Sequence, residues 1–226
     1  MEAGKRRIRE ALPRVKFRIA APSEETHPRL MIVAAFLLLL VVGFRVVLGV
    51  THMDDAAWLH NFSPLAAVAL CGAIYLPRRL AFFLPLMALL ISDLLINARY
   101  GVALVTGEML SRYVALALVA GLGLALREKA RAPLVLGAAV FGSVLFFLLT
   151  NSASWLTDPA YAKTAAGWVQ ALTTGVAGVR PTTLEFFRNT LISDLLFSAV
   201  FVACMNVRRA GGNAVAPRPQ EAARWC

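Results

Sequence analysis

Six apolar segments dominate the sequence and limit what the chain can fold into. A helix that crosses a bilayer core about 30 Å thick needs about 20 apolar residues. Together the segments make the chain 59% hydrophobic, whereas a soluble domain is about 45–50% apolar. The sequence therefore predicts an all-α, polytopic membrane protein, a six-transmembrane-helix bundle with spans at Leu30–Val50, Phe62–Leu76, Leu80–Ile96, Tyr113–Leu126, Leu134–Leu156 and Leu184–Val207.

Polar and basic sequence flanks these segments at both ends. We expect a basic cytoplasmic arm at 1–29, a membrane domain at 30–207 and a cytoplasmic tail at 208–226. The arm is too long for the charged region of a signal peptide, and no clear small-residue cleavage site follows the first apolar segment. We therefore expect the arm to be retained.

Lysines and arginines are divided unevenly between the two sides of the predicted bundle. The arm, the second and fourth connections and the tail carry 17 of the 23 basic residues, and the opposite side carries five. An excess of basic residues marks the cytoplasmic side. We therefore expect a multi-pass protein of the cytoplasmic (inner) membrane with both termini in the cytoplasm. Because the net charge of +10 lies beside the apolar segments, we expect the lipid bilayer as a partner and no nucleic acid.

Two carboxylates lie inside apolar segments. Asp93 is near the outer end of the third segment and Asp194 is near the middle of the sixth. An ionisable group at membrane depth costs at least ~2.5 kcal/mol, so it usually faces the bundle interior or a wet cavity. Each carboxylate is predicted either to contact a substrate or proton, or to form a structural polar pair, for instance with an arginine.

The same five-residue string surrounds both carboxylates. Ile91–Leu95 and Ile192–Leu196 both read Ile-Ser-Asp-Leu-Leu, in segments predicted to cross in opposite directions. An inverted repeat of three plus three helices, common in transporters, would produce this. Coincidence in a leucine-rich chain is the alternative.

Other polar residues also gather toward the outer ends of the segments. Asn151 and Asn189 are predicted to contact a substrate or to make hydrogen bonds between helices. Asn61 precedes the second segment, where it can cap the helix. Cys71 is either an inert small hydrophobe or a soft metal ligand. Outside the bundle, the stretch 165–179, which contains Trp168, is predicted to be an interfacial helix or a lid.

Four strings of residues resemble, in order along the chain, a family of uncharacterised prokaryotic membrane proteins, DUF6580. The strings cover about Asn61 to Phe201: Asn61–Leu70, Pro85–Leu86 with Ser92–Leu95, Leu145–Asn151 with Trp155, and Phe186–Leu191 with Asp194–Leu196. That family in turn resembles the substrate-binding S-components of energy-coupling-factor (ECF) vitamin transporters, which are six-helix membrane proteins. It is similar among them to the BtuM-like cobalamin-uptake proteins, in which a membrane cysteine ligates cobalt.

The resemblance implies a membrane-embedded protein that binds a vitamin-like small molecule for uptake, with an ECF-type ATPase module as partner. Cobalamin is one candidate substrate, and Cys71 is then the candidate ligand to its cobalt. We expect capture beneath the outer loops His52–His60 and Thr157–Thr183. The candidate substrate contacts are Asn61, Cys71, Asp93, Asn151, Trp155, Arg188, Asn189 and Asp194.

Two other functions are compatible with the residues. One is a structural or assembly membrane protein without a substrate. The other is a membrane enzyme, for instance one that modifies a corrinoid at Cys71. No hydrolase or nucleotide-binding signature occurs in the sequence, and the histidines lie in or beside predicted loops. We therefore expect a binding protein without catalytic residues.

Overall fold

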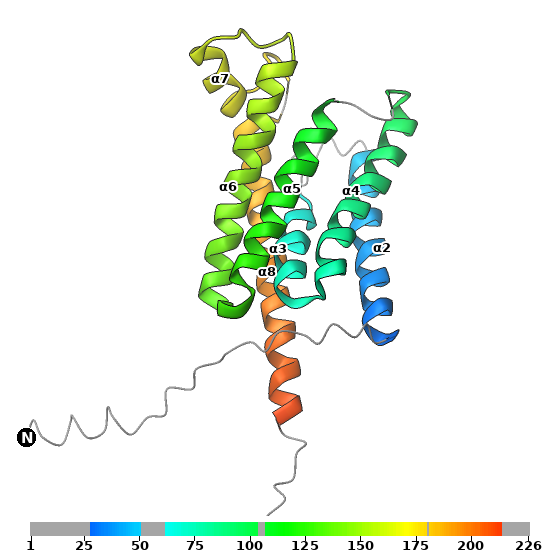
Figure 1. Cartoon of the computed structure of the whole chain (residues 1–226). Helices are drawn as coiled ribbons and strands as arrows, with labels where there is room; N and C mark the ends of the chain where they lie inside the picture. The colour runs from blue at the N-terminus through cyan, green and yellow to red at the C-terminus, as the bar shows by residue number, and fades with distance from the viewer. Residues whose placement is uncertain (1–27, 51–61, 104–106, 180, 214–226) are drawn as a thin grey trace, which may run out of the picture.

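The described part of the chain is helical throughout. The computed structural model describes residues 28–50, 62–103, 107–179 and 181–213, and no strand occurs in these ranges (Figure 1). The all-α prediction is confirmed. The helices are α2 (Pro28–Val50), α3 (Leu65–Tyr75), α4 (Arg78–Tyr100), α5 (Gly107–Leu126), α6 (Ala132–Thr157), α7 (Ala165–Leu172) and α8 (Thr183–Asn213), with a 3₁₀ turn at Arg127–Lys129 between α5 and α6.

Four of these helices are long and apolar enough to cross a membrane. They are α4, α6, the stretch Glu108–Lys129 that contains α5, and the stretch Thr183–Met205 of α8. Shorter apolar helices lie at Leu39–Gly49 and Leu65–Tyr75. Large hydrophobic side chains are exposed along α2, α4, α5, α6 and α8, which suits helices that contact lipid. The chain is therefore a membrane protein.

Helix α3 lies at the centre of the bundle and contacts α4, α5, α6 and α8. All eleven of its residues are buried. Its sequence is rich in alanine, and small residues allow helix backbones to approach closely in a membrane. At 1.5 Å per residue, α3 is only about 16 Å long, roughly half of the bilayer core. The predicted second segment therefore yields a half-length helix, because the helix begins only after Pro64.

Close contact between α3 and α5 depends on Gly123. A Cβ atom added there would lie 2.5 Å from the carbonyl oxygen of Leu70 and 2.7 Å from the Cβ of Ala73. Neither contact is sterically tolerable for a fixed backbone. Two residues earlier, Gly121 has open space around the same position. Gly123 thus sets the distance between α5 and the central helix.

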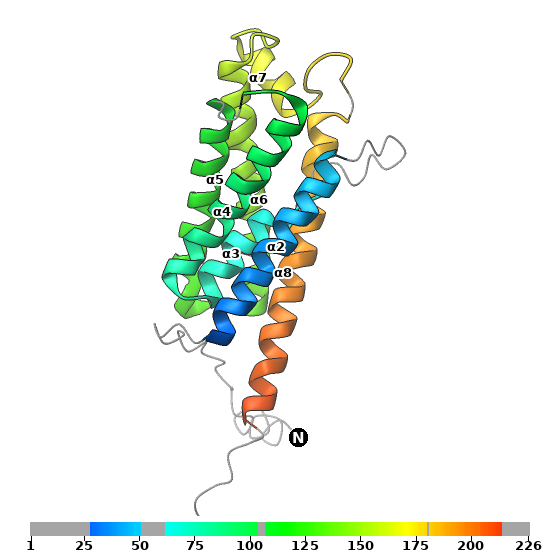
Figure 2. The ribbon, with the colours of Figure 1, turned by 90° about the vertical axis from the view of Figure 1, so that its right-hand side faces the viewer.

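The two ends of the bundle differ. The first turn of α2 and the last turn of α8 lie at one end, and α7 lies at the opposite end (Figures 1 and 2). α7 packs mainly against α6, and Trp168 Nε1 donates a hydrogen bond to Ser152 Oγ (2.8 Å). The loop that follows α7 returns to α8 at this end, above the region described next.

Candidate ligand-binding cavity

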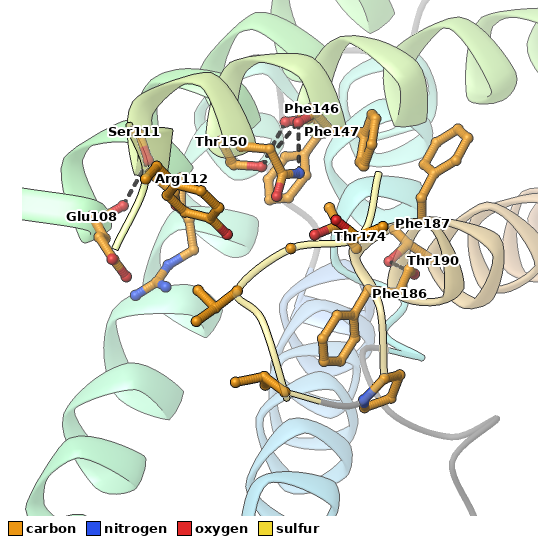
Figure 3. A pocket seen from close by; sticks show the side chains of 18 of the residues that line it. Glu108, Ser111, Arg112, Phe146, Phe147, Thr150, Thr174, Phe186, Phe187 and Thr190 are labelled. Carbon is orange, nitrogen blue, oxygen red and sulfur yellow. Dashed lines mark hydrogen bonds between the residues drawn. The ribbon is translucent and has the colours of Figure 1, made fainter. Parts of the chain in front are cut away.

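A cavity of about 370 Å³ opens at the α7 end of the bundle. This volume lies within the range of small-molecule sites, about 300–1,000 Å³. Residues from α2, α4, α5, α6 and α8 and from the segments before and after α7 line it, and Figure 3 shows most of their side chains. Its lining residues fall into a basic group, an aromatic group and several hydroxyl and amide groups.

The cavity lies close to the start of the short helix α3. Helices α4, α5, α6 and α8 surround α3, and the same four helices line the cavity. On α6, Phe147 lines the cavity, whereas Ser143, one turn away, contacts the carboxylate that caps α3. On α8, Thr190 lines the cavity and Asp194, one turn away, supplies that carboxylate. The cavity therefore lies about one helical turn from the side chains that contact the start of α3.

The basic group is built around one buried carboxylate. Asp93 Oδ1 accepts a hydrogen bond from an Nη atom of Arg45 (2.6 Å), and Asp93 Oδ2 accepts one from an Nη atom of Arg112 (3.1 Å). Arg45 Nε also donates to Ser92 Oγ (2.8 Å). The Asp93 side chain is 5% exposed, against 18% for Arg45 and 31% for Arg112. Both arginines line the cavity, and Asp93 lies behind them.

This group carries an excess of positive charge. One carboxylate faces two guanidinium groups, and arginine stays protonated in proteins. The Nε of Arg112 is buried and has no hydrogen-bond partner within the described ranges. Glu108, four residues before Arg112 on α5, also lines the cavity but is exposed. The buried end of the basic group is therefore positive, and the acidic residue lies toward solvent.

An aromatic wall faces this charge from α6 and α8. The rings of Phe147 and Phe187 have centroids 4.4 Å apart at an interplanar angle of 35°, and Phe146 and Phe186 also line the cavity. Asn151 is in the lining, and its Nδ2 donates to the carbonyl of Phe147 (2.8 Å). The cavity thus combines apolar surface with a few placed polar groups, the usual composition of a small-molecule site.

The loop between α7 and α8 covers the cavity. Gly175 adopts a left-handed conformation with φ of 75°, which favours glycine. Gln170 fixes this residue from both sides, because its backbone carbonyl accepts from the Gly175 N–H (2.9 Å) and its Nε2 donates to the Gly175 carbonyl (3.0 Å). Thr182 and Glu185 form a capping box at the start of α8. Hydrogen bonds therefore hold the loop between α7 and α8 near both of its ends.

Tyr161 adds a neutral donor at the cavity wall. It lies between α6 and α7, is 8% exposed and lines the cavity. Burial raises the pKa of its phenol, and the carboxylates of Asp158 and Glu108 raise it further. The phenol is therefore protonated at neutral pH and can donate a hydrogen bond into the cavity.

Asp194 lies beneath the cavity and caps α3. Its Oδ1 accepts from the backbone N–H of Ala67 (3.2 Å), in the first turn of α3, and its Oδ2 accepts from Ser143 Oγ (2.5 Å). The residue is 1% exposed. Carboxylates are stabilised at helix N-termini, where backbone N–H groups have no partner within the helix. Asp194 is thus a structural cap between three helices.

The predicted site residues differ in their position relative to the cavity. Asn151 lines the cavity, Asp93 holds its arginines, and Asp194 lies one turn below it. Cys71 is fully buried in the core next to Ser198 and is not in the lining. The remaining predictions, Trp155, Arg188 and Asn189, lie outside the lining, and Asn61 is outside the described residues.

The predicted residues outside the lining form hydrogen bonds with residues close to them in the sequence. Trp155 Nε1 donates to the carbonyl of Ala162 (2.9 Å), which ties the end of α6 to the following turn. Arg188 is exposed, and it donates to the Oδ1 of its neighbour Asn189, which is buried. The predicted alternative of a polar pair with an arginine is confirmed for Asp93. Residues of the loop Thr157–Thr183 line the cavity, and the loop His52–His60 lies outside the described residues.

Sequence reasoning missed the two arginines of the cavity. Arg45 is the sole charged residue of the segment Leu30–Val50, and Arg112 directly precedes the segment that begins at Tyr113. Both were counted only as flanking or interrupting charges. A search for basic residues able to neutralise Asp93 at its membrane depth would have found them, because buried charges in membranes are usually paired.

The chain was compared with protein families, with curated proteins and with solved structures. The model of the family described as "Family of unknown function (DUF6580)" matches residues 24–214. No curated protein matches the chain. No solved structure matches it either.

Proposed function

This chain belongs to the DUF6580 family, and we propose that it is a membrane-embedded binding protein for the uptake of a vitamin-like small molecule. The cavity of about 370 Å³ at one end of the apolar bundle is the observation that carries this proposal. A protein that served only helix packing would gain nothing from a half-length central helix that leaves such a space. The mixture of aromatic, hydroxyl, amide and basic groups around it suits the capture of one small, partly polar molecule.

We further propose that α2 and α3 complete a bundle of six membrane helices with S-component-like architecture. Both termini would then lie in the cytoplasm, as the basic arm and tail predict, and the protein would reside in the inner membrane. The α7 end of the bundle, opposite the first turn of α2 and the last turn of α8 (Figure 2), would face outward. The cavity would then receive its ligand from the outer side.

Release to the cytoplasm requires a conformational change in this proposal. The side chains that contact the first turn of α3 lie one helical turn from the cavity lining, so passage toward the cytoplasm would require the packing around α3 to open. We propose that a partner ATPase of the ECF type supplies the energy, as it does for the S-components that the family resembles. The buried and close-packed α3 is the element that would have to shift.

A corrinoid remains one candidate substrate, with Cys71 as its cobalt ligand. The position of Cys71 makes a smaller molecule the better candidate. The thiol is fully buried and is separated from the cavity by the first turn of α3, so cobalt binding would require α3 to unpack. We therefore favour a ligand that is smaller than a corrinoid and that fits the cavity without movement of α3.

Growth of a vitamin auxotroph tests the proposal. The wild-type chain, expressed with and without an ECF module in a host that lacks its own uptake system, should restore growth at a low concentration of one vitamin. Thr150→Trp should abolish rescue, because Thr150 lines the cavity and the indole would fill it. Leu148→Trp is the matched control, since Leu148 is 40% exposed on the same helix outside the lining.

The outcomes separate the uptake protein from a structural protein. Rescue by the wild type and by Leu148→Trp, but not by Thr150→Trp, supports uptake through the cavity. Absence of rescue by every vitamin, despite normal amounts of protein in the membrane, would contradict the proposal and favour a structural or assembly role. Equal rescue by both tryptophan variants would show that the cavity is not the uptake site.

A further inference from the structure

The basic group identifies the chemical class of the ligand. Resting on the proposed uptake function, we propose that the ligand carries an organic anion, a carboxylate or a phosphate, that binds between Arg45 and Arg112. Its remaining part would be apolar and flat, and would lie against the wall formed by Phe146, Phe147, Phe186 and Phe187.

The first argument is the unbalanced charge at the buried end of the cavity. Asp93 offers two oxygens, and each is already used by a different arginine. Each guanidinium group has five N–H donors in a fixed fork, so most of the donors of Arg112 have no partner within the described ranges. A second carboxylate or a phosphate would balance the charge and accept these donors, and arginine is well suited to such groups.

The second argument is the depth of the charge. Buried charges in membranes are usually neutralised by partners. A purely structural ion pair would therefore need only one arginine for the one carboxylate. Here the Asp93 side chain is 5% exposed, and the side chains of Arg45 and Arg112 are 18% and 31% exposed. Glu108 is the acidic residue among the described residues that line the cavity. It is exposed and makes no ion pair with Arg112 among the described residues, so solvent screens its charge.

The third argument is the placement of the arginines. They are held by Asp93 and Ser92 on α4, so their forks are oriented before a ligand arrives. Ser92 is itself fixed, because its hydroxyl donates to the carbonyls of Ala88 (2.7 Å) and Leu89 (3.0 Å). Positioned donors of this kind bind an anion without a large loss of side-chain entropy. Figure 3 shows Arg112 and the phenylalanines on different sides of the same space.

Matched pairs of acids and amides test the proposal. The full-length protein in phosphatidylcholine nanodiscs would be titrated with benzoate and benzamide, nicotinate and nicotinamide, and indole-3-acetate and indole-3-acetamide, with phenyl phosphate as the phosphate probe. Binding would be followed by tryptophan fluorescence and by the shift of the unfolding temperature. We expect at least one acid or the phosphate to bind about tenfold or more tightly than its neutral counterpart.

Three variants assign the effect to the cavity. Arg112→Gln should weaken binding of the acid about tenfold to a hundredfold, the loss expected for a hydrogen bond to a charged group, and should leave binding of the amide unchanged. Arg112→Lys keeps the charge and should retain part of the preference for the acid. Arg99→Gln is the control, because Arg99 is exposed at the end of α4 and is not in the lining.

Each result decides one question. Amides that bind as tightly as acids, or acids that bind equally to wild type and Arg112→Gln, would overturn the anion proposal and leave uptake standing. Lack of response to every acid at millimolar concentration would also overturn it, and growth rescue in the auxotroph would then show that uptake survives with another class of ligand. A response that disappears when phosphatidylglycerol replaces phosphatidylcholine would assign the arginines to a lipid headgroup, which overturns a soluble substrate.

Discussion

Substitution of Gly123 by alanine tests the packing on which the cavity depends. The added Cβ would lie 2.5 Å from the carbonyl oxygen of Leu70 and 2.7 Å from the Cβ of Ala73. Both atoms belong to the central helix α3 rather than to the end of a flexible side chain. Relief of the overlap therefore requires α5 and α3 to separate by several tenths of an ångström along their contact.

The magnitude follows from a comparison within α5. Overpacking of a close-packed interior costs about 1–3 kcal/mol. Glycine to alanine in a helix interior also stabilises the helix by roughly 0.5–1 kcal/mol. Gly121→Ala gains the same helix preference without the clash, because nothing lies within 4 Å of the added Cβ. The helix preference cancels between the two variants, so Gly123→Ala should be about 1–3 kcal/mol less stable than Gly121→Ala.

Unfolding of both variants in mixed detergent micelles, titrated with dodecyl sulfate and followed by tryptophan fluorescence, measures this difference. The predicted gap corresponds to about a fivefold to 150-fold change in the unfolding equilibrium. Equal stability of Gly123→Ala and Gly121→Ala would refute the close approach of α5 to α3. Because Arg112 lies nearer the start of the same helix, separation of α5 from α3 should also weaken acid binding in the variant that remains folded.

Two further predictions concern residues beneath the cavity. Asp194→Ala should lower the free energy of unfolding by about 1–2 kcal/mol, the usual cost of a lost helix cap. Asp194→Asn keeps an oxygen for the Ala67 N–H and should lower it less. Thermal unfolding in detergent measures both variants, and a greater loss in the asparagine variant would contradict the cap. In a Cys226→Ser background, a lipid-permeable maleimide should label Cys204 in the native protein and Cys71 only after unfolding, because Cys204 is exposed and Cys71 is buried. Mass spectrometry of the labelled peptides measures the extent of labelling at each cysteine. Rapid labelling of native Cys71 would show that α3 opens readily.

The sequence was sufficient to predict the helices and their general position. Long apolar runs specify membrane helices by length and composition alone, and α4, α6 and α8 include most of their predicted segments. The start of α3 was missed by three residues, because Phe62-Ser63-Pro64 continues the apolar run although the helix begins after Pro64. Hydropathy averages over such a boundary and does not locate the first residue of the helix.

The composition of the site was harder to predict, because it depends on which helix faces meet. A pair with an arginine was one of the two predicted roles of Asp93, yet its two arginines come from α2 and α5, 48 and 19 residues away in the sequence. Cys71 was singled out because of its chemistry. Every residue of α3 is buried and its sequence is apolar on all sides. The sequence of this helix therefore could not show whether Cys71 lies in a ligand site or in the packed core.

The short central helix connects the cavity with the buried carboxylate of Asp194. A helix that begins inside a membrane bundle leaves backbone N–H groups without partners in a medium that lacks water. Pro64 removes one such donor by having no N–H, and Asp194 accepts the N–H of Ala67. The start of α3 inside the bundle therefore creates the need for the cap close to the cavity. It follows that substitution of Asp194 should reduce the amount of folded protein, whereas substitution of Arg112 should reduce the affinity of protein that is folded, even though the two residues flank the same cavity.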